Sequence, residues 1–252
     1  MRNTRLISRL DVKGPNLIKG MHLEGLRVLG RPQIFAKKYY QEGIDEIVYM
    51  DVVASLYGRN SLHALVSETA RDVFVPITVG GGIRSIDDVS RMLSAGADKV
   101  ALNTALNRDP ELINQLVRYF GSQCIVLSVE AKLRDVDMWE VYVDNGREPT
   151  GKDVLDWVKE CEDRGVGEII LTSVDREGTR KGFDDRLVRA VTEIVDIPVI
   201  ASGGMGSVEH ATSVVLNAGA DAIAIADMLH YDRIEIPQLK LMLREQGLNL
   251  RP

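Results

Sequence analysis

The chain has 252 residues with 37 acidic and 31 basic side chains, so its formal net charge is −6. This length fits one large α/β domain or two ordinary ones, and the acidic balance argues against a nucleic-acid partner, which needs a basic face. No apolar run approaches the roughly 18 residues of a membrane span, and the N-terminus lacks the apolar core of a secretion signal. We therefore expect a cytoplasmic globular protein without membrane insertion.

Apolar runs alternate with amphipathic helical patterns along the whole chain. We predict strands near residues 5–12, 46–53, 76–80, 98–102, 123–129, 168–174, 197–201 and 221–226, and helices over 33–41, 61–73, 86–95, 110–120, 152–164, 185–195, 208–218 and 236–246. Such alternation predicts βαβ crossovers and a parallel sheet. Eight units of about 31 residues (252/8) favour a closed (β/α)8 TIM barrel over an open doubly wound sheet.

An internal repeat runs through the sequence. The segment PITVGGGIRSIDDVSRMLSAGADKVALNT begins at Pro76, and the similar PVIASGGMGSVEHATSVVLNAGADAIAIAD begins at Pro198, an offset of 198 − 76 = 122. GIDEIVYM from Gly43 matches GVGEIILT from Gly165 at the same offset. The repeat predicts a single barrel, residues 1–252, built from two fused half-barrels at about 1–122 and 123–252.

Residues 133–151 interrupt this alternation. Apolar residues alternate there around Asp144-Asn145-Gly146, which is a hairpin turn signal. We therefore expect a β-hairpin inserted after the fifth strand. A long loop at this position of a barrel often acts as a lid, although a hairpin without a function is the alternative.

Two acidic residues stand where opposite barrel strands are expected to end. Asp11 ends the first predicted strand and Glu130 the fifth, and 130 − 11 = 119 is close to the repeat offset. Active sites of such barrels lie at the C-terminal strand ends. A pair of carboxylates can divide acid and base roles when their surroundings separate their pKa values. We predict that Asp11 and Glu130 are catalytic; the alternative is that they only cap strand ends.

Glycine-rich turns follow the third and seventh predicted strands. Glycine lets backbone N–H groups approach an anion closely. The two turns, with the residues after the next strand, therefore predict two phosphate cradles related by the repeat, rather than tight turns alone. The first consists of Gly81, Gly82, Asn103 and Thr104, and the second of Ser202, Gly203, Gly204, Ala226 and Asp227.

Charged residues begin four of the predicted strands at the opposite face of the barrel. They are Arg5, Glu46, Lys99 and Glu168. Two bases and two acids can form a ring of ion pairs that closes the barrel bottom, and charges that point into a barrel need partners because an unpaired buried charge is costly. Ordinary solvated strand ends are the alternative.

Motifs spread over essentially the whole chain resemble the cyclase subunit of imidazole glycerol phosphate synthase. They include LDVK…KG at 10–20, TVGGGI at 78–83, ADKVALNT at 97–104, GEIILTSVDREGT at 167–179 and IASGG at 200–204. The resemblance implies a barrel enzyme of histidine biosynthesis. In that family a separate glutaminase subunit docks at the N-terminal face and releases ammonia, which crosses the barrel to a phosphoribulosyl-formimino substrate. Cleavage and ring closure give imidazole glycerol phosphate and an aminoimidazole carboxamide ribotide.

The same resemblance assigns roles to individual residues. It places the catalytic pair at Asp11 and Glu130, the substrate-anchoring lysine at Lys19, and further substrate contacts at Glu177 and Gly178. It makes the charged ring an ammonia gate and places Asp98 in the partner-docking region. No cofactor and no metal is implied, since the four histidines are scattered and no metal-ligand spacing is present. Cys124, in a predicted strand, and Cys161, in a predicted helix, are poor candidates for nucleophiles.

Departures from the family pattern lie at the active face. Glu130 and Glu177 replace aspartates, Arg9 replaces a cysteine, and Asp227 replaces a small hydroxyl residue, where it would repel a phosphate. Together with SLYGRNSL at 55–62, these changes resemble a paralogous branch that, with a glutaminase, supplies ammonia to an amidotransferase making acetamidino sugars for surface polysaccharide. Both functions remain open. A third possibility is a non-enzymatic scaffold that binds the glutaminase. A barrel isomerase with a phosphate site is a weaker alternative, because the SVDREGT motif and the charged ring argue against it.

Overall fold

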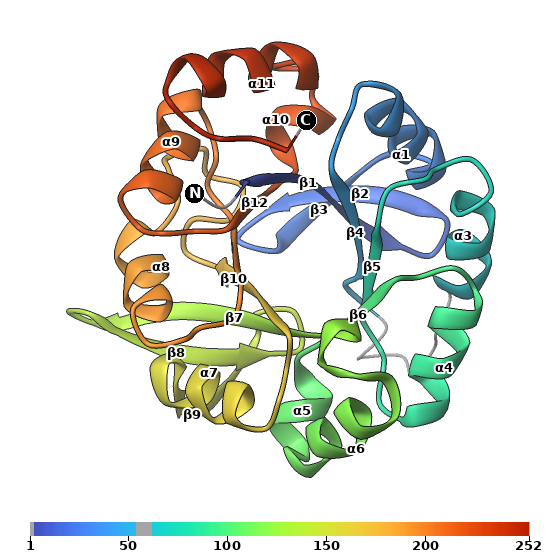
Figure 1. Cartoon of the computed structure of the whole chain (residues 1–252), viewed down its shortest axis with the longest axis vertical. Coiled ribbons are helices and arrows are strands. Elements are labelled where there is room, and N and C mark those ends of the chain that lie inside the picture. Colours follow the sequence, from blue (N-terminus) through green and yellow to red (C-terminus); the bar gives the residue numbers. More distant parts are fainter. Residues whose placement is uncertain (1–2, 54–61, 252) are drawn as a thin grey trace.

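Eight parallel strands close into a barrel surrounded by helices (Figure 1). The computed structural model describes residues 3–53 and 62–251. Strands β7 and β10 pair and close the ring. This confirms the predicted (β/α)8 barrel. The barrel strands are β1 (Arg5–Lys13), β4 (Glu46–Asp51), β5 (Ile77–Gly80), β6 (Lys99–Leu102), β7 (Ile125–Asp135), β10 (Glu168–Ser173), β11 (Val199–Ser202) and β12 (Ala222–Ile225).

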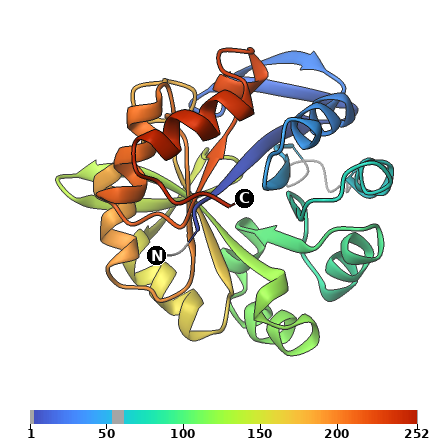
Figure 2. The same ribbon diagram turned by 45° about the horizontal axis from the view of Figure 1, so that its top comes forward.

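The helices pack around the outside of the strands, as the turned view makes clear (Figure 2). All eight predicted helices are present. They are α1 (Pro32–Gln41), α3 (Leu62–Thr69), α4 (Ile86–Ser94), α6 (Glu111–Phe120), α7 (Val154–Asp163), α8 (Asp185–Thr192), α9 (Val208–Leu216) and α11 (Ile236–Glu245). Three further short helices in the described part of the chain were not predicted: α5 (Thr104–Arg108), η1 (Ser122–Cys124) and α10 (Asp227–His230).

Several element boundaries differ from the prediction by a few residues, and two of these differences have a clear local cause. Cys124 lies in η1 and not in a strand, because the chain turns at Gly121 (φ 81°) before β7 begins. Helix α7 begins two residues later than predicted. Its N-cap is Asp153, whose side chain accepts hydrogen bonds from the amides of Leu155 and Asp156 and so ends the preceding strand.

Hairpins extend from the ends of β1 and β7. The predicted hairpin corresponds to β8 (Met138–Val143) and β9 (Glu148–Asp153), which continue antiparallel from β7. A second hairpin, β2 (Asn16–Met21) and β3 (Glu24–Gly30), follows β1 and was not predicted. Adding 122 to the bounds of β2 gives 138–143, the bounds of β8.

The two hairpin turns have nearly the same backbone conformation. His22 and Leu23 have φ of 51° and 63°, and Asp144 and Asn145, 122 residues later, have 51° and 62°. The turns meet over the barrel mouth, where the Asn145 side chain donates a 3.2 Å hydrogen bond to the Leu23 carbonyl. The contact links the two hairpins above the site described below.

The barrel interior has an apolar middle layer. Eight small or branched apolar side chains fill it, with Met50 packed against them. This layer separates the charged bottom of the barrel from the polar mouth. Its members are Ile7, Val48, Ala101, Val126, Ile170, Ile200, Ala222 and Ala224. Among the described residues, no helix is both long and apolar enough to span a lipid bilayer.

Candidate active site

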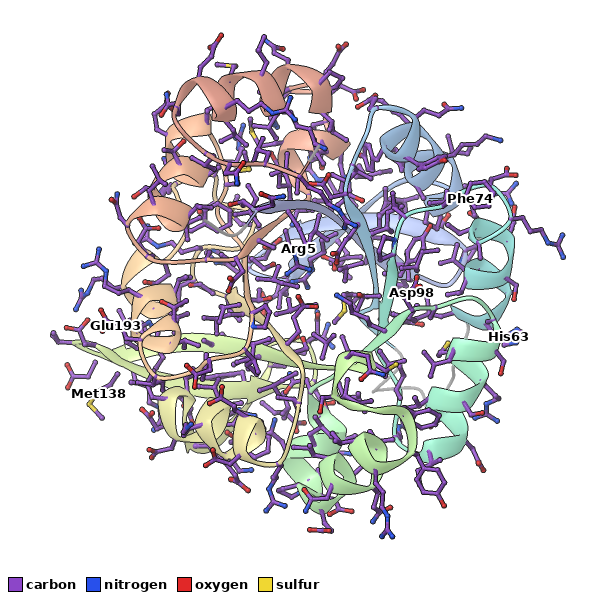
Figure 3. All side chains as sticks on the ribbon, viewed as in Figure 1. Arg5, His63, Phe74, Asp98, Met138 and Glu193 are labelled. Carbon is purple, nitrogen blue, oxygen red and sulfur yellow. The ribbon has the colours of Figure 1, made fainter. Side chains whose placement is uncertain are left out.

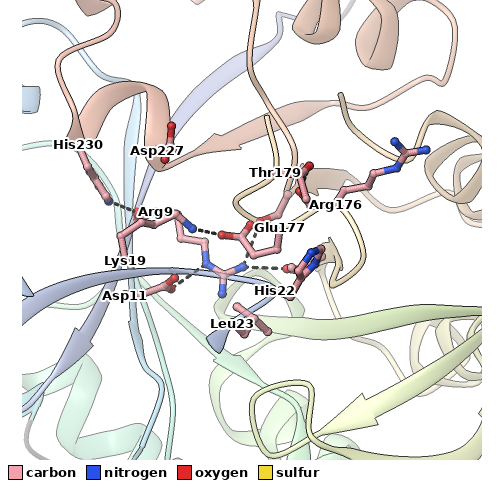
Figure 4. A network of polar contacts seen from close by, with 12 residues as sticks. Arg9, Asp11, Lys19, His22, Leu23, Arg176, Glu177, Thr179, Asp227 and His230 are labelled. Carbon is pink, nitrogen blue, oxygen red and sulfur yellow. Dashed lines mark hydrogen bonds and ion pairs between the residues drawn. The ribbon is translucent and has the colours of Figure 1, made fainter. Parts of the chain in front are cut away.

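An ion pair lies buried at the mouth of the barrel. Side chains of a strand alternate between its faces, so Arg9 and Asp11 both point inward from β1, and both are almost fully buried. The Arg9 guanidinium donates to Asp11 Oδ1 at 2.9 Å and to the hydroxyls of Thr172 at 2.8 Å and Ser202 at 3.1 Å (Figure 4). Arg9, noted in the sequence only as a departure, is thus a central member of the site.

Asp11 and Glu130 lie on opposite sides of the mouth, because β1 and β7 are four strands apart around the barrel. β1 and β7 both continue beyond these residues, so neither carboxylate ends its strand as predicted. Glu130 is buried and its Oε2 accepts hydrogen bonds from the Asn103 side chain at 3.0 Å and the Gly146 amide at 2.8 Å. Both predicted catalytic residues therefore face the same mouth.

The surroundings of Asp11 and Glu130 move the pKa values of the two carboxyl groups in opposite directions. Burial raises the pKa of Glu130 to about 7, although its hydrogen bond from Gly146 acts against that rise. Burial would also raise the pKa of Asp11, but the charges of Arg9 and Lys19 outweigh it and hold the pKa below its ordinary value. At neutral pH Asp11 is therefore ionised, whereas Glu130 can hold and release a proton.

The first predicted cradle opens onto a cavity of about 290 Å³. Gly81, Gly82, Asn103 and Thr104 all line it, and Glu130 borders the same space. Gly81 has φ of 100°, and a Cβ there would stand 2.2 Å from the Asp51 carbonyl oxygen. Only glycine fits this turn, so the structure brings the predicted residues together around an open space beside one catalytic candidate.

Replacing Gly81 with alanine is expected to destabilise the protein and close the first cradle. The left-handed conformation alone costs a non-glycine residue about 1–2 kcal/mol, and the clash with Asp51 adds to it. Gly43→Ala is a matched control, because Gly43 also has a positive φ (86°) but a Cβ added there would have no atom within 4 Å. Urea unfolding should show a larger loss of unfolding free energy for Gly81→Ala than for Gly43→Ala. Equal losses would contradict the close approach of Gly81 to the Asp51 backbone.

The second predicted cradle borders a small cavity. Ser202, Gly203, Gly204, Ala226, Asp227 and Gly178 line a cavity of only about 20 Å³, which holds about one water molecule. Lys19, carried by the hairpin strand β2, forms a buried ion pair with Glu177 beside it (Figure 4). The structure thus assembles these predicted residues around a much smaller cavity than that of the first cradle.

His230 is a site residue that sequence reasoning missed. Its Nε2 lies 3.0 Å from the Arg9 carbonyl oxygen, and its Nδ1 lies 2.8 Å from the Tyr39 hydroxyl. Burial lowers the pKa of His230 to about 4, so the ring is neutral and holds β1 in place behind Arg9. No sequence pattern marked this histidine.

The charged residues at the barrel bottom form a ring. Arg5 donates to Glu46 at 2.8 Å and to Glu168 at 2.6 Å, and Lys99 lies 2.7 Å from Glu168 and 3.5 Å from Glu46. Burial alone would lower the pKa of Arg5, but the two carboxylates hold it above its ordinary value. The ring of ion pairs expected from the sequence is therefore present, and the solvated alternative is wrong.

Asp98 lies at the same face, beside the ring (Figure 3). Its carboxylate accepts a 2.8 Å hydrogen bond from the Ile77 amide. Asp221, its counterpart in the repeat, accepts an equivalent 2.9 Å bond from Val199. Asp98 therefore has a structural role in joining neighbouring strands, and its exposed position leaves it available at the surface.

The described residues contain no group of three or more His, Cys, Asp or Glu side chains placed to hold a metal ion. Cys161 is buried, and burial raises the pKa of its thiol far above the ordinary range. A thiol of this kind is a poor nucleophile at neutral pH.

Comparison with known proteins gives one consistent result. The family model described as "Histidine biosynthesis protein" matches residues 5–235. A Legionella pneumophila protein named "Imidazole glycerol phosphate synthase subunit HisF" is 63% identical over 210 residues, which cover 83% of this chain and 99% of that protein. A protein of the same name from Myxococcus xanthus (strain DK1622) is 47% identical over 251 residues, covering 100% of this chain and 99% of that protein. The resemblance found in the sequence is confirmed: the chain belongs to the histidine biosynthesis protein family, as a HisF-type subunit of imidazole glycerol phosphate synthase.

Proposed function

We propose that this chain performs the cyclase reaction, in which ammonia and the phosphoribulosyl-formimino ribotide give imidazole glycerol phosphate and the aminoimidazole carboxamide ribotide. The observation that carries the proposal is the pair of buried carboxyl groups, Asp11 and Glu130, whose pKa values are moved apart on opposite sides of one mouth. The open first cradle beside Glu130 supports a phosphorylated substrate.

The two carboxyl groups suit the proton transfers of this reaction. The nitrogen that enters as ammonia must lose protons as it bonds to carbon, and the ribotide nitrogen that leaves must gain one. In the proposed mechanism the ionised Asp11 accepts a proton and the protonated Glu130 donates one. Arg9 acts through Asp11, because its hydrogen bond fixes that carboxylate in place and keeps it ionised.

The proposal is tested with the purified chain, the formimino ribotide and an ammonium salt. Consumption of the ribotide and release of the carboxamide product are expected. No turnover at high ammonia, with the chain folded, would overturn the cyclase assignment.

We further propose that a glutaminase subunit docks at the N-terminal face and that the charged ring is the gate for its ammonia. Two observations support this. The ring closes the barrel bottom, and the layer above it is apolar, a surrounding in which neutral ammonia is favoured over the ammonium ion. Asp98, exposed beside the ring, belongs to the proposed docking face.

Replacing Lys99 with methionine is expected to impair the use of ammonia from the glutaminase more than the use of ammonia from an added ammonium salt. Lys99 joins Glu46 and Glu168 across the ring, so its loss opens one side of the closure. With the glutaminase present, the glutamine-dependent rate should fall relative to the rate with added ammonium salt. Lys37→Met, at an exposed ion pair with Asp72, is the control and should change neither rate. An unchanged ratio in Lys99→Met would argue against the gate.

A second candidate function is ammonia supply, with a glutaminase, to an amidotransferase that forms acetamidino sugars. The small cavity at the second cradle favours it, since a site for two phosphates needs more space there. The SLYGRNSL segment that also pointed this way lies outside the described residues except for Leu62. Deleting the gene distinguishes the two functions: histidine auxotrophy supports the cyclase, and altered surface polysaccharide without auxotrophy supports ammonia supply.

A further inference from the structure

The first cradle has no charged side chain of its own, since it consists of two glycines, an asparagine and a threonine. Three carboxyl groups, those of Asp51, Asp109 and Glu130, line the same cavity. A phosphate dianion that entered the cavity would be repelled by carboxylates there. Phosphate binding at this cradle therefore needs a cation beside it.

Three arginines line this cavity and could supply that cation: Arg9, Arg84 and Arg108. Arg9 is buried and already donates to a carboxylate and two hydroxyls. Arg108 ends the short helix α5 and lies four residues after Thr104, so the two side chains share one face of that helix. Arg108 is thus placed beside a residue of the cradle.

The Asp144 carboxylate shows how close the Arg108 guanidinium and the Thr104 hydroxyl lie to each other. Asp144 is almost fully buried in the turn between β8 and β9. Its Oδ2 lies 3.3 Å from Arg108 Nη2, and its Oδ1 lies 3.4 Å from the Thr104 hydroxyl. A single anion can therefore contact both groups. Guanidinium groups bind carboxylates and phosphates through the same donors.

The Arg108 guanidinium keeps donors for a ligand. Within residues 3–53 and 62–251, its contact with Asp144 is the one hydrogen bond or ion pair that it makes. A guanidinium carries several N–H groups in a rigid plane, so one edge can contact Asp144 while another contacts a ligand in the cavity that Arg108 lines. The Arg108 side chain is 68% exposed and that of Asp144 only 7%, so the buried carboxylate orients the more exposed cation.

We propose that Arg108 is a substrate-binding residue, which binds the phosphate group held at the first cradle. The Arg108 guanidinium and the Thr104 hydroxyl contact that phosphate together, and Asp144 is the positioning residue that orients Arg108. This inference rests on the proposed function and deepens it. The ribotide carries a phosphate group at each end, and Arg108 binds the one that lies on the side of Glu130.

The test uses inorganic phosphate as the probe and follows the amide NMR signals of Gly82 and Gly203, which report on the two cradles separately. In Arg108→Met, half-saturation of the Gly82 signal should need about tenfold more phosphate, because a hydrogen bond between charged groups is lost. The response of Gly203 should stay as in the wild type. Arg108→Lys keeps the charge but loses the planar donors, so its value should be intermediate.

Arg91→Met is the matched control. Arg91 is 62% exposed and pairs with Asp88, whose side chain is 15% exposed, but it does not line the cavity. The Gly82 signal of this variant should titrate as in the wild type. The proposal would be overturned by an equal weakening in Arg91→Met, by an unchanged titration in folded Arg108→Met, or by a wild-type Gly82 signal that does not respond to phosphate.

Steady-state rates with the formimino ribotide and an ammonium salt provide a second measurement. Arg108→Met should raise KM for the ribotide by about tenfold and leave kcat nearly unchanged, since the phosphate contact is the same in the ground state and the transition state. Phosphate binding needs no turnover, so the two proposals can fail separately. An inactive wild-type chain with the expected phosphate titrations would overturn the cyclase assignment alone. An active chain whose Arg108→Met variant keeps the wild-type KM would overturn the role of Arg108 alone.

Discussion

Replacing Glu130 with glutamine should lower the cyclase rate by about 10²- to 10⁴-fold, the usual contribution of a positioned proton donor. The amide keeps the shape and an oxygen acceptor for the Gly146 amide, so the fold should survive. In the wild type, activity should fall as pH rises through about 7, because the protonated form of Glu130 is the donor. Steady-state rates between pH 5.5 and 8.5 (a span of about 3 units around that pKa) test this, and the variant should lack that decline.

Two controls accompany this variant. Glu130→Asp retains the carboxyl group but withdraws it by one methylene, so a large loss would show that reach matters as much as acidity. Unfolding free energy gives an independent measurement. A carboxyl whose pKa is raised by folding stabilises the protein below its ordinary pKa of 4.5, and that contribution is lost as pH rises through about 7. In the Glu130→Gln variant, this dependence of the unfolding free energy on pH should disappear. If the variant kept the wild-type dependence, the raised pKa of Glu130 would be contradicted.

Replacing Arg9 with methionine should cost about 3–5 kcal/mol of folding free energy, as expected when one partner of a buried ion pair is removed. Asp11 would remain buried with only Lys19 nearby to offset its charge. Arg9→Lys keeps the charge but cannot reach Asp11, Thr172 and Ser202 together, so its loss should be intermediate. Urea unfolding at neutral pH measures all three proteins.

The surface pair Arg186–Asp137 provides the matched control. Both side chains are 59% exposed, so Arg186→Met should cost no more than about 1 kcal/mol. The pH dependence has a defined sign. Because the pKa of Asp11 is lowered in the folded state, the pair stabilises the protein above the ordinary aspartate pKa, and this is lost as pH falls through the lowered value. Arg9→Met should lose this acid dependence; stability equal to Arg186→Met would contradict the buried pair.

The barrel was predictable because its signals are local and repeated. Strand and helix periods, and the charged residues that begin β1, β4, β6 and β10, follow from residue order alone. The β2–β3 hairpin was missed because His22-Leu23 is an unusual pair for a left-handed turn, which favours Asn, Asp or Gly. The repeat could have predicted this hairpin, because the bounds of β2 lie 122 residues before those of β8.

The side-chain contacts within the site were harder to predict than the strands that carry them. The sequence placed Asp227 in the second cradle, but its ion-pair partners Arg180 and Arg233 come from loops whose side-chain directions no periodic pattern specifies. The same holds for Arg9, whose partners Thr172 and Ser202 lie on strands far away in sequence. Contacts of this kind depend on how the closed barrel brings distant strands together.

The two hairpin turns over the mouth have also become complementary in shape. Leu23 keeps a left-handed conformation that costs it about 1–2 kcal/mol, yet its side chain is buried. A methyl group on Gly146 would stand 3.2 Å from it. The Leu23 side chain on one turn thus packs against the backbone of Gly146 on the other turn. In the repeat, Leu23 corresponds to Asn145 and Gly146 to Glu24, so the two turns are no longer interchangeable. A larger side chain at Gly146 should therefore require a smaller one at Leu23.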